Sequence, residues 1–311
     1  MNALLLDYTH PLLEQCLEQG GIGLWREYEL APKDFPSHYF TAEVVVIRSR
    51  FPVTREVIDL FPNLKAIGRL GAGLENIDVD YAKSRGIACL RVPKGNAQAV
   101  AEHSLGMLLG LLNHLPRVHY EIKEGIWRRE ENKGLELRSR TAGIIGYGVI
   151  GSQFARLLAA LGVIVLAYDK YKTGYADAGI TESTLEELQQ KCDIISLHLP
   201  LTEETRYFAD DTFFNAFQNP IYFLNTARGP ILQTEALVRA MKTGNVVGAG
   251  LDVLEFENKS FTSLFEGEMP HSLQWLVNQE NIMLSPHIAG WTKESFEKMG
   301  AGLAAKILDV L

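Results

Sequence analysis

The sequence predicts an α/β protein with two doubly wound parallel sheets, in which one unit interrupts the other. Short apolar runs bounded by turn residues recur along the chain, and segments with helical periodicity separate them. Strands that alternate with helices in this way indicate parallel sheets. A glycine-rich turn between two such runs begins at Gly146, near the middle of the 311 residues. A chain of this length is typical of two domains.

The first hundred residues provide four candidate strands and two candidate helices. The strands are the apolar runs at 3–7, 43–49, 64–71 and 86–93, and the helices are the segments at 10–19 and 78–86. The pattern changes from Gln98, because segment 99–127 is apolar over too wide an arc for an exposed helix. This segment is either buried in a large core or shared with a partner subunit. We expect Pro116 to end or kink it.

The alternation of strands and helices resumes after residue 140. Candidate strands lie at 141–148, 163–169, 192–200, 221–229, 246–254 and 281–287, and candidate helices at 183–191, 234–244 and 293–308. The last helix follows His287, and we expect it to return to the first unit.

Composition and charge exclude several classes of function. A net charge of −8 at pH 7 argues against nucleic acid or an anionic membrane as the partner. Cys16, Cys89 and Cys192 have no CxxC spacing, so we expect no disulfide framework, no zinc site and no other metal. The chain begins without the pattern of a signal peptide, and no apolar run approaches about 20 residues. We therefore expect a cytoplasmic protein.

The glycines of the central turn fit the spacing G-x-G-x-x-G with Gly146, Gly148 and Gly151. The first glycine permits a tight turn, the second lets a pyrophosphate approach the backbone, and the third lets helix and strand pack closely. Asp169 follows 18 residues after Gly151, at the end of the next strand. Its carboxylate can accept both hydrogen bonds of a ribose diol and would repel a 2′-phosphate, so we predict NAD as the cofactor. The alternative is a structural turn with an ordinary strand-end aspartate.

Four polar side chains follow later strands: Arg228, Asp252, Glu257 and His287. Ligands of open α/β sheets bind beyond the carboxyl ends of the strands. An arginine can hold a substrate carboxylate through two hydrogen bonds, and a histidine can exchange the proton of a hydroxyl group. A nearby glutamate would fix the tautomer of that histidine and stabilise its imidazolium form. These residue types suffice for hydride transfer at a carbinol carbon.

Each of these residues also has an ordinary structural interpretation. Arg228 could bridge two loops, Glu257 could be a solvated acid, and His287 could cap a helix. Their combination behind a dinucleotide turn favours catalysis. His198, at the end of another strand, is expected to line the cofactor cleft.

Several further motifs occur in an order that identifies the family. They are GAGLENID at 71–78, GNAQAVAEHSLGMLL at 95–109, HLPLTEETRY at 198–207, NTARG at 225–229, GAGLDV at 248–253 and SPHIAGWT at 285–292. Together with the glycine turn, they resemble the D-isomer-specific 2-hydroxyacid dehydrogenases over nearly the whole chain. The resemblance implies a Rossmann NAD-binding domain at 98–286, inserted into a flavodoxin-like substrate domain at 1–97 and 287–311. It also implies a homodimer formed through the apolar segment after Gln98.

The resemblance assigns roles to individual residues. Arg228 would bind the carboxylate, His287 would act as acid and base, and Glu257 would support His287. The backbone of Gly71, Ala72 and Gly73 would hold the substrate carboxylate. The cofactor would contact Ala72, Gly146, Gly148, Val149, Ile150, Gly151, Asp169, His198, Pro200, Thr226, Asp252 and Gly290.

Within the family, the amino-terminal half is most similar to members that oxidise 3-phospho-D-glycerate to 3-phosphohydroxypyruvate, the first step of L-serine biosynthesis. Arg48 and Arg69 are candidates for the substrate phosphate, because arginine forks suit phosphate oxygens. The alternative is that both form ion pairs at the surface or between the domains. Arg128 and Arg129 are further candidate cations. One rival is a reductase of glyoxylate, hydroxypyruvate or another 2-keto acid. A rival of another class is an NAD(H)-sensing regulator without catalysis.

Two features depart from the family pattern. Asn258 stands where the family has a proline after its catalytic glutamate, and the following stretch, 259–279, is longer than usual. This stretch could fold over the cleft, pack on its rim or be a surface excursion. We expect no added regulatory domain and therefore no feedback by serine.

Overall fold

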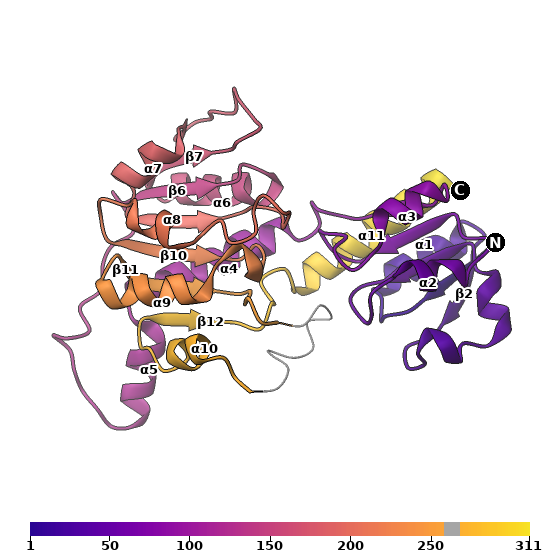
Figure 1. Ribbon diagram of the computed structural model, residues 1–311, viewed down its shortest axis with the longest axis horizontal. Coiled ribbons are helices and arrows are strands. Elements are labelled where there is room, and N and C mark those ends of the chain that lie inside the picture. The colour runs from indigo at the N-terminus through magenta and orange to yellow at the C-terminus, as the bar shows by residue number, and fades with distance from the viewer. Residues whose placement is uncertain (258–267) are drawn as a thin grey trace. The chain divides into compact units, whose positions relative to one another are not determined.

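A computed structural model describes residues 1–257 and 268–311 (Figure 1). The described chain divides into two compact units. The first unit contains residues 1–97 and 291–311, and the second contains residues 98–257 and 268–290. The sequence places the second crossover at 286/287, four residues before the observed one. The difference assigns His287 to the second unit, because the backbone N–H of His287 donates to the carbonyl of Asp252 at 2.7 Å.

The first unit is built on a parallel sheet of five strands in the order β2-β1-β3-β4-β5. The strands are β1 (Asn2–Leu5), β2 (Gly23–Arg26), β3 (Val44–Ile47), β4 (Ala66–Arg69) and β5 (Ala88–Leu90). This order is the flavodoxin-like arrangement, with its switch point between β1 and β3. All four residues of β3 are buried, as expected for a central strand that is covered on both faces.

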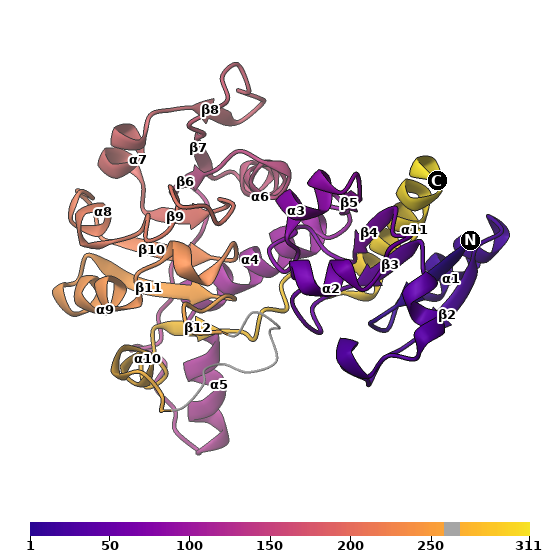
Figure 2. The ribbon, with the colours of Figure 1, turned by 45° about the vertical axis from the view of Figure 1, so that its right-hand side comes forward.

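Helices cover both faces of this sheet (Figures 1 and 2). On one face, α1 (Pro11–Gln19) and the C-terminal helix α11 (Lys293–Val310) pack through residues such as Leu13, Leu17 and Leu303. On the other face, α2 (Arg55–Asp59) and α3 (Val79–Ser84) pack with two short 3₁₀ helices, η1 (Pro32–Asp34) and η2 (Ser37–Thr41). The last helix therefore completes the unit that the first residues begin.

The second unit is built on a parallel sheet of seven strands in the order β12-β11-β10-β9-β6-β7-β8. The strands are β6 (Thr141–Ile145), β7 (Ile164–Tyr168), β8 (Ile180–Glu182), β9 (Ile194–Leu197), β10 (Ile221–Asn225), β11 (Val246–Leu251) and β12 (Ile282–Leu284). Counted from β6, this is the doubly wound order of dinucleotide-binding sheets, extended by one strand. The predicted α/β class with two doubly wound parallel sheets is confirmed.

The two faces of the second sheet are covered by different helices. On one face lie α4 (Ala97–Leu112) and α6 (Val149–Ala160), which bury Leu108 and Phe154. The other face carries α7 (Leu185–Lys191), α8 (Asp211–Asn215), α9 (Thr234–Thr243), α10 (His271–Leu276) and the 3₁₀ helix η3 (Gly229–Ile231). Among the described residues, no helix combines the length and the apolarity that crossing a membrane requires.

The apolar segment after Gln98 forms two helices instead of one kinked helix. Helix α4 ends at Leu112, His114 adopts a left-handed conformation with φ of 54°, and α5 (Leu115–Lys123) carries Pro116 in its first turn. Proline fits there because the first amides of a helix have no intrahelical acceptor. Helix α4 is largely buried in the core, whereas α5 leaves large apolar side chains exposed.

The long stretch 259–279 is described only from residue 268. Its helix α10 buries Leu273 and Leu276 in the core of the second unit, and Trp275 packs against the same core. This part therefore contributes to the domain and is not a surface excursion. Phe261, Phe265 and Asn258 lie outside the described residues.

Candidate active site

The glycine turn connects β6 to α6 at the switch point of the second sheet, between β6 and β9. Gly146 has φ of 95°, and a Cβ there would approach the carbonyl oxygen of His198 to 2.5 Å. A Cβ at Gly151 would collide with the carbonyl oxygen of Gly146. Both glycines are thus required by the turn itself.

Gly148 differs from these two glycines, because a Cβ there would meet nothing within 4 Å. It is the N-cap residue of α6, and no side chain caps this helix end. The first N–H groups of α6 are therefore available to an anion, and the helix dipole favours negative charge there. Val149 and Ile150 begin the same turn of α6. The arrangement fits the pyrophosphate of a dinucleotide.

Asp169 follows β7, at the position expected for a ribose-binding carboxylate. Its Oδ2 accepts from the backbone N–H of Tyr147 at 2.9 Å, and its Oδ1 accepts from that of Tyr171 at 3.0 Å. Each carboxylate oxygen has a further lone pair for a ligand hydroxyl. The neighbouring lysines are engaged, since Lys170 pairs with Glu204 and Lys172 donates to the carbonyl of Tyr147. This geometry fits a ribose diol better than a 2′-phosphate.

His198 lies against the glycine turn. Its Nε2 lies 2.9 Å from Oγ of the buried Ser196, and its ring packs against Phe154 with the centroids 5.6 Å apart. Burial lowers the pKa of His198 to about 3, so the ring is neutral. Nδ1 is buried without a hydrogen-bond partner among the described residues. The backbone of His198 borders the turn, and the contacts of its ring favour a structural role. Its place in the cofactor cleft stays a prediction.

The three candidate catalytic residues, Arg228, Glu257 and His287, all belong to the second unit. Nδ1 of His287 lies 3.1 Å from Oε1 and 3.2 Å from Oε2 of Glu257. Both side chains are largely buried, with exposed fractions of 22% and 13% respectively. A carboxylate at Nδ1 fixes the ring orientation and the tautomer, and it stabilises the protonated ring.

His287 has a φ of 53°, which places it in the left-handed region. Residues other than glycine rarely adopt this conformation unless surrounding contacts hold them there. Asp252 provides such contacts, because its carboxylate accepts from the backbone N–H groups of Ile288 and Ala289, each at 2.9 Å. Ser285 Oγ donates to the same carboxylate at 2.6 Å. Asp252 is only 1% exposed and thus orients the loop of His287.

Arg228 is presented by a tight turn after β10. The buried side chain of Asn225 accepts from the N–H of Ala227 at 3.0 Å and donates to the carbonyl of Arg228 at 3.1 Å. A Cβ at Gly229 would collide with the carbonyl of Leu254, so only glycine allows this approach of the two loops. Thr226, in the same turn, lies 3.1 Å from Ser104 Oγ on α4.

Among the other predicted cofactor residues, Pro200 follows β9 and Gly290 ends the second unit.

The candidate carboxylate loop, Gly71–Gly73, follows β4 in the first unit. All three of its carbonyl groups are taken: Gly71 accepts from the N–H of Val92, Ala72 from Arg91, and Gly73 from Arg69. The N–H groups of Ala72 and Gly73 donate to no residue that the structure describes. Successive free N–H groups form a concavity that binds anions.

Arg69 is 6% exposed and holds two loops together. Its Nε donates to the carbonyl of Arg48 at 3.1 Å, and its Nη1 donates to that of Gly73 at 3.0 Å. The same guanidinium lies 3.6 Å from Glu75. These contacts favour the structural interpretation of Arg69 over the phosphate-binding one.

Arg48 follows β3, next to the switch point of the first sheet. The carboxylate of Asp7, which comes after β1, accepts from the backbone N–H of Arg48 at 2.6 Å. The guanidinium of Arg48 makes no hydrogen bond or ion pair with any described residue. Its Cζ lies 4.2 Å from the ring centroid of Trp291. Arg48 thus combines a fixed backbone with an available cationic head.

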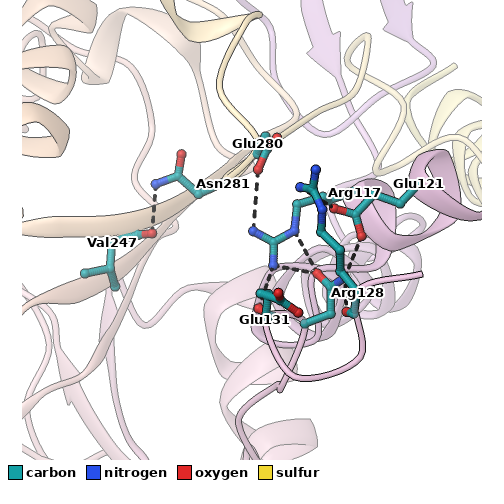
Figure 3. Close-up of polar contacts among 8 residues, drawn as sticks. Arg117, Glu121, Arg128, Glu131, Val247, Glu280 and Asn281 are labelled. Atoms are coloured by element: carbon teal, nitrogen blue, oxygen red, sulfur yellow. Dashed lines mark hydrogen bonds and ion pairs between the residues drawn. The ribbon is translucent and has the colours of Figure 1, made fainter. Parts of the chain in front are cut away.

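Of the two candidate cations near Trp127, Arg128 has a partner, Glu121, whereas Arg129 contacts no polar group among the described residues. Figure 3 shows Arg128 beside Glu121, at 3.3 Å, and Arg117 reaching Glu280 at 3.5 Å. Asn132 donates to Glu121 as well. This network stabilises the segment after α5. The part of the chain that the structure describes contains no group of three side chains able to hold a metal ion.

Several residues of the site were not identified from the sequence. They are Asp7, Ser285, Asn225, His103, whose Nε2 lies 2.9 Å from Ser285 Oγ, and Trp291. Asp7 follows β1, Asn225 ends β10 and Ser285 directly follows β12, so all three lie at strand ends, which was the available signal. His103 gave none, because its contact with Ser285 joins residues 182 positions apart in the sequence.

Comparisons with known proteins agree with this geometry. The family described as D-isomer specific 2-hydroxyacid dehydrogenase, NAD binding domain, matches residues 105–289. The hydroxypyruvate reductase of Thermotoga maritima is 36% identical over 86% of this chain and 85% of its own length. The D-3-phosphoglycerate dehydrogenase of Pongo abelii is 31% identical over the whole chain, which spans 56% of the length of that relative.

Solved structures give the same result. The D-lactate dehydrogenase of Aquifex aeolicus, complexed with NAD and lactic acid, superposes with a TM-score of 0.84 at 30% identity and covers 99% of this chain and 94% of its own. The family match, the relatives and the glycine turn agree. The chain belongs to the D-isomer specific 2-hydroxyacid dehydrogenase family and contains the NAD-binding domain of that family.

Proposed function

We propose that this protein is a cytoplasmic, NAD-dependent dehydrogenase that interconverts 3-phospho-D-glycerate and 3-phosphohydroxypyruvate, at the head of serine biosynthesis. The choice of substrate rests on the position of Arg48. Its guanidinium lies at a switch point of the sheet and has no polar partner among the described residues. Ligands of open α/β sheets bind at such points. Relatives named D-3-phosphoglycerate dehydrogenase that match the whole chain support the same substrate.

The reaction assigns one task to each side chain. Arg228 holds the substrate carboxylate through two hydrogen bonds and polarises the neighbouring C2 oxygen. Because Nδ1 of His287 faces Glu257, Nε2 exchanges the proton of the C2 hydroxyl group. A bound nicotinamide would supply the hydride acceptor for C2 during oxidation and the hydride donor during reduction. Glu257 stabilises the imidazolium of His287 that forms when the hydroxyl proton is taken up.

The N–H groups of Ala72 and Gly73 provide a second set of donors for the carboxylate. They carry no formal charge, yet a carboxylate that accepts from several backbone N–H groups is well stabilised. Arg48 then binds the phosphate at the other end of the substrate. Arg69 takes no direct part in this proposal, because its donors hold the loops that carry the other two groups.

A reductase of hydroxypyruvate or glyoxylate is the second candidate. The observation in its favour is the length of the relatives. This chain covers 85% of the hydroxypyruvate reductase of Thermotoga maritima but only 56% of the D-3-phosphoglycerate dehydrogenase of Pongo abelii. Such an enzyme would use the same catalytic residues and would leave Arg48 without a substrate group. A regulator that only senses NAD(H) is disfavoured by the ordered pair of His287 and Glu257.

A homodimer is part of the same proposal. Helix α5 and the segment that follows it expose large apolar side chains, with exposed fractions of 52% for Leu115, 63% for Tyr120, 56% for Ile122 and 80% for Trp127. Exposed apolar patches of this kind mark protein–protein contacts. Sedimentation of the wild type and of a variant with Tyr120 and Ile122 changed to serine tests the dimer, which the variant should weaken.

The experiment that tests the substrate is initial-rate oxidation of NADH by purified protein with 3-phosphohydroxypyruvate, hydroxypyruvate and glyoxylate. We expect kcat/KM to be at least about 100-fold higher for the phosphorylated keto acid, as two charge-assisted hydrogen bonds to phosphate would give. Equal or higher values for the unphosphorylated acids would replace the proposal by the second candidate.

A further inference from the structure

The guanidinium of Arg48 lies on the aromatic ring of Trp291, with Cζ 4.2 Å from the ring centroid, and both residues belong to the first unit. An arginine that stacks on a ring uses the face of its guanidinium, while the N–H donors lie in its plane. The contact with the ring holds the charge in place, and the guanidinium donors have no polar partner among the described residues. Trp291 remains 49% exposed, so the ring is accessible from solvent.

Trp291 is itself fixed by the start of the last helix. Thr292 caps α11 by accepting from the N–H of Ser295 at 3.1 Å, and Ser295 Oγ accepts from the N–H of Thr292 at 3.0 Å. Trp291 precedes this capping box and contacts Phe296, with ring centroids 5.2 Å apart. This pair has the positions of a hydrophobic staple, which sets the angle at which the chain enters a helix.

A further contact of Phe296 supports the staple. Phe296 packs edge-on against His10, with ring centroids 5.7 Å apart, and His10 caps α1 by accepting from the N–H of Leu12. The ring of Trp291 is thus connected through Phe296 to the packing of α1 and α11.

The backbone of Arg48 is fixed at both of its polar groups. Its N–H donates to Asp7, and its carbonyl accepts from Arg69 at 3.1 Å and from Asn76 at 3.4 Å. Only the side chain of Arg48 retains rotational freedom. An unrestrained arginine loses up to about 2 kcal/mol of rotamer entropy when it binds a ligand. A ring that holds the side chain in advance removes part of this cost.

We propose that Trp291 is a positioning residue for substrate selection: it holds the Arg48 guanidinium flat so that its in-plane donors bind the phosphate of the substrate. This inference rests on the proposed function, because it assumes that Arg48 binds that phosphate. The simpler alternative is that Trp291 only staples α11 and has no influence on the substrate. The two differ in whether the loss of the aromatic face changes the preference between substrates.

The test compares 3-phosphohydroxypyruvate with hydroxypyruvate in each variant, so that a general loss of stability cancels in the ratio of kcat/KM. Trp291→Leu keeps an apolar staple but removes the ring, whereas Trp291→Phe keeps both. Arg48→Ala removes the proposed phosphate ligand. Tyr81→Leu is the matched control, because it removes a ring under another arginine of the first unit, Arg55, whose Cζ lies 4.5 Å from that ring.

We expect Arg48→Ala to lower the ratio by about 10- to 100-fold, as the loss of charge-assisted hydrogen bonds does. Trp291→Leu should lower it about three- to fivefold, the size of an exposed cation–π contact. Trp291→Phe should restore most of the preference, and Tyr81→Leu should leave it unchanged. In the Arg48→Ala background, Trp291→Leu should have no further effect on the ratio.

The possible failures are distinguishable. If Arg48→Ala leaves the ratio unchanged, the proposed phosphate site is wrong, and the role of Trp291 is wrong with it. If Arg48→Ala lowers the ratio but Trp291→Leu does not, the proposed function stands and Trp291 is only a staple. If Trp291→Leu lowers the ratio of kcat/KM equally in the wild type and in the Arg48→Ala variant, the inference is also overturned.

Discussion

Nδ1 of His287 lies 3.1 Å from Oε1 of Glu257, and the second carboxylate oxygen lies at 3.2 Å from the same nitrogen. A neutral glutamine in place of Glu257 keeps the shape of the side chain but loses the charge that stabilises the protonated ring. We predict that Glu257→Gln lowers kcat for keto acid reduction about 10- to 100-fold, less than the full acid–base contribution of about 10²–10⁴-fold, because His287 itself remains.

The matched control is Glu255→Gln on the same loop. Glu255 accepts from Tyr207 Oη and from the N–H of Thr234, so its role is structural. Its variant should retain kcat within about threefold, allowing for a modest loss of hydrogen bonding. A similar kcat for Glu257→Gln and the wild type would show that Glu257 does not support His287.

We expect Asp252 to affect both stability and kcat, because it fixes the backbone around His287. Asp252→Asn cannot accept all of the N–H and O–H donors that the carboxylate accepts from Ser285, Ile288 and Ala289. We predict a loss of about 2–4 kcal/mol in the free energy of unfolding, typical of an unsatisfied buried polar group, and a large fall in kcat. Denaturant unfolding and steady-state kinetics of the same preparation measure both. Wild-type stability would contradict this account of the loop.

Arg69 and Arg48 should differ in a way that kinetics can detect. Arg69→Met keeps the aliphatic length but removes the hydrogen bonds to the carbonyls of Arg48 and Gly73. One of the two loops that lose support is proposed to bind the carboxylate, which phosphorylated and unphosphorylated keto acids share. Arg69→Met should therefore raise KM for both substrates about tenfold or more, as the loss of one or two such bonds does. A rise confined to the phosphorylated acid would instead make Arg69 a phosphate ligand.

The preference for NAD over NADP is expected to depend on Asp169. Asp169→Ser removes the charge that would repel a 2′-phosphate and the acceptors of the ribose diol. We predict that kcat/KM for NADH falls about 10- to 100-fold. The ratio of kcat/KM for NADH to kcat/KM for NADPH should fall by a larger factor, because the loss of repulsion favours NADPH. Lys170 and Lys172 already have partners. A ratio that stays constant would exclude Asp169 from the ribose site.

His198 makes a contribution to stability that depends on pH. Burial lowers the pKa of His198 to about 3, below its ordinary value of 6.5. The unfolded chain therefore binds a proton below about pH 6.5 that the folded chain does not bind, and stability is lost as the pH falls through this window. Between pH 7 and pH 5 the wild type should lose about 2 kcal/mol more than His198→Gln. Denaturant unfolding at both pH values tests this, and equal losses would contradict the buried, neutral ring.

Much of the fold could be predicted from the sequence, because buried parallel strands form short apolar runs. The strands of the second unit that surround the glycine turn are of this kind, for example Ile194–Leu197, with all four residues buried. Strands β2 and β8 were not predicted. Both lie at a sheet edge, and Gly23–Arg26 includes exposed residues, so neither has a continuous apolar pattern.

The site was predictable where chemistry follows a strand end. Arg228, Asp252 and His287 were found in this way, and the structure places all three after strands β10, β11 and β12. The roles of Arg69 and His198 could not be predicted, since nothing local shows that their side chains turn inward. The position of Trp291 has a local sequence signal, because WTKESF at 291–296 has the spacing of a hydrophobic staple around a capping box.

The proposed function depends on hydride transfer in the second unit with His287 as acid and base. The most direct measurement follows the absorbance of reduced nicotinamide when stoichiometric NADH and the wild type meet an excess of 3-phosphohydroxypyruvate in a single turnover. We predict complete oxidation of NADH by the wild type and a rate at least about 100-fold lower for His287→Gln. NADH that binds tightly but is oxidised by neither protein, with any 2-keto acid, would contradict the claim and leave a sensor of NAD(H).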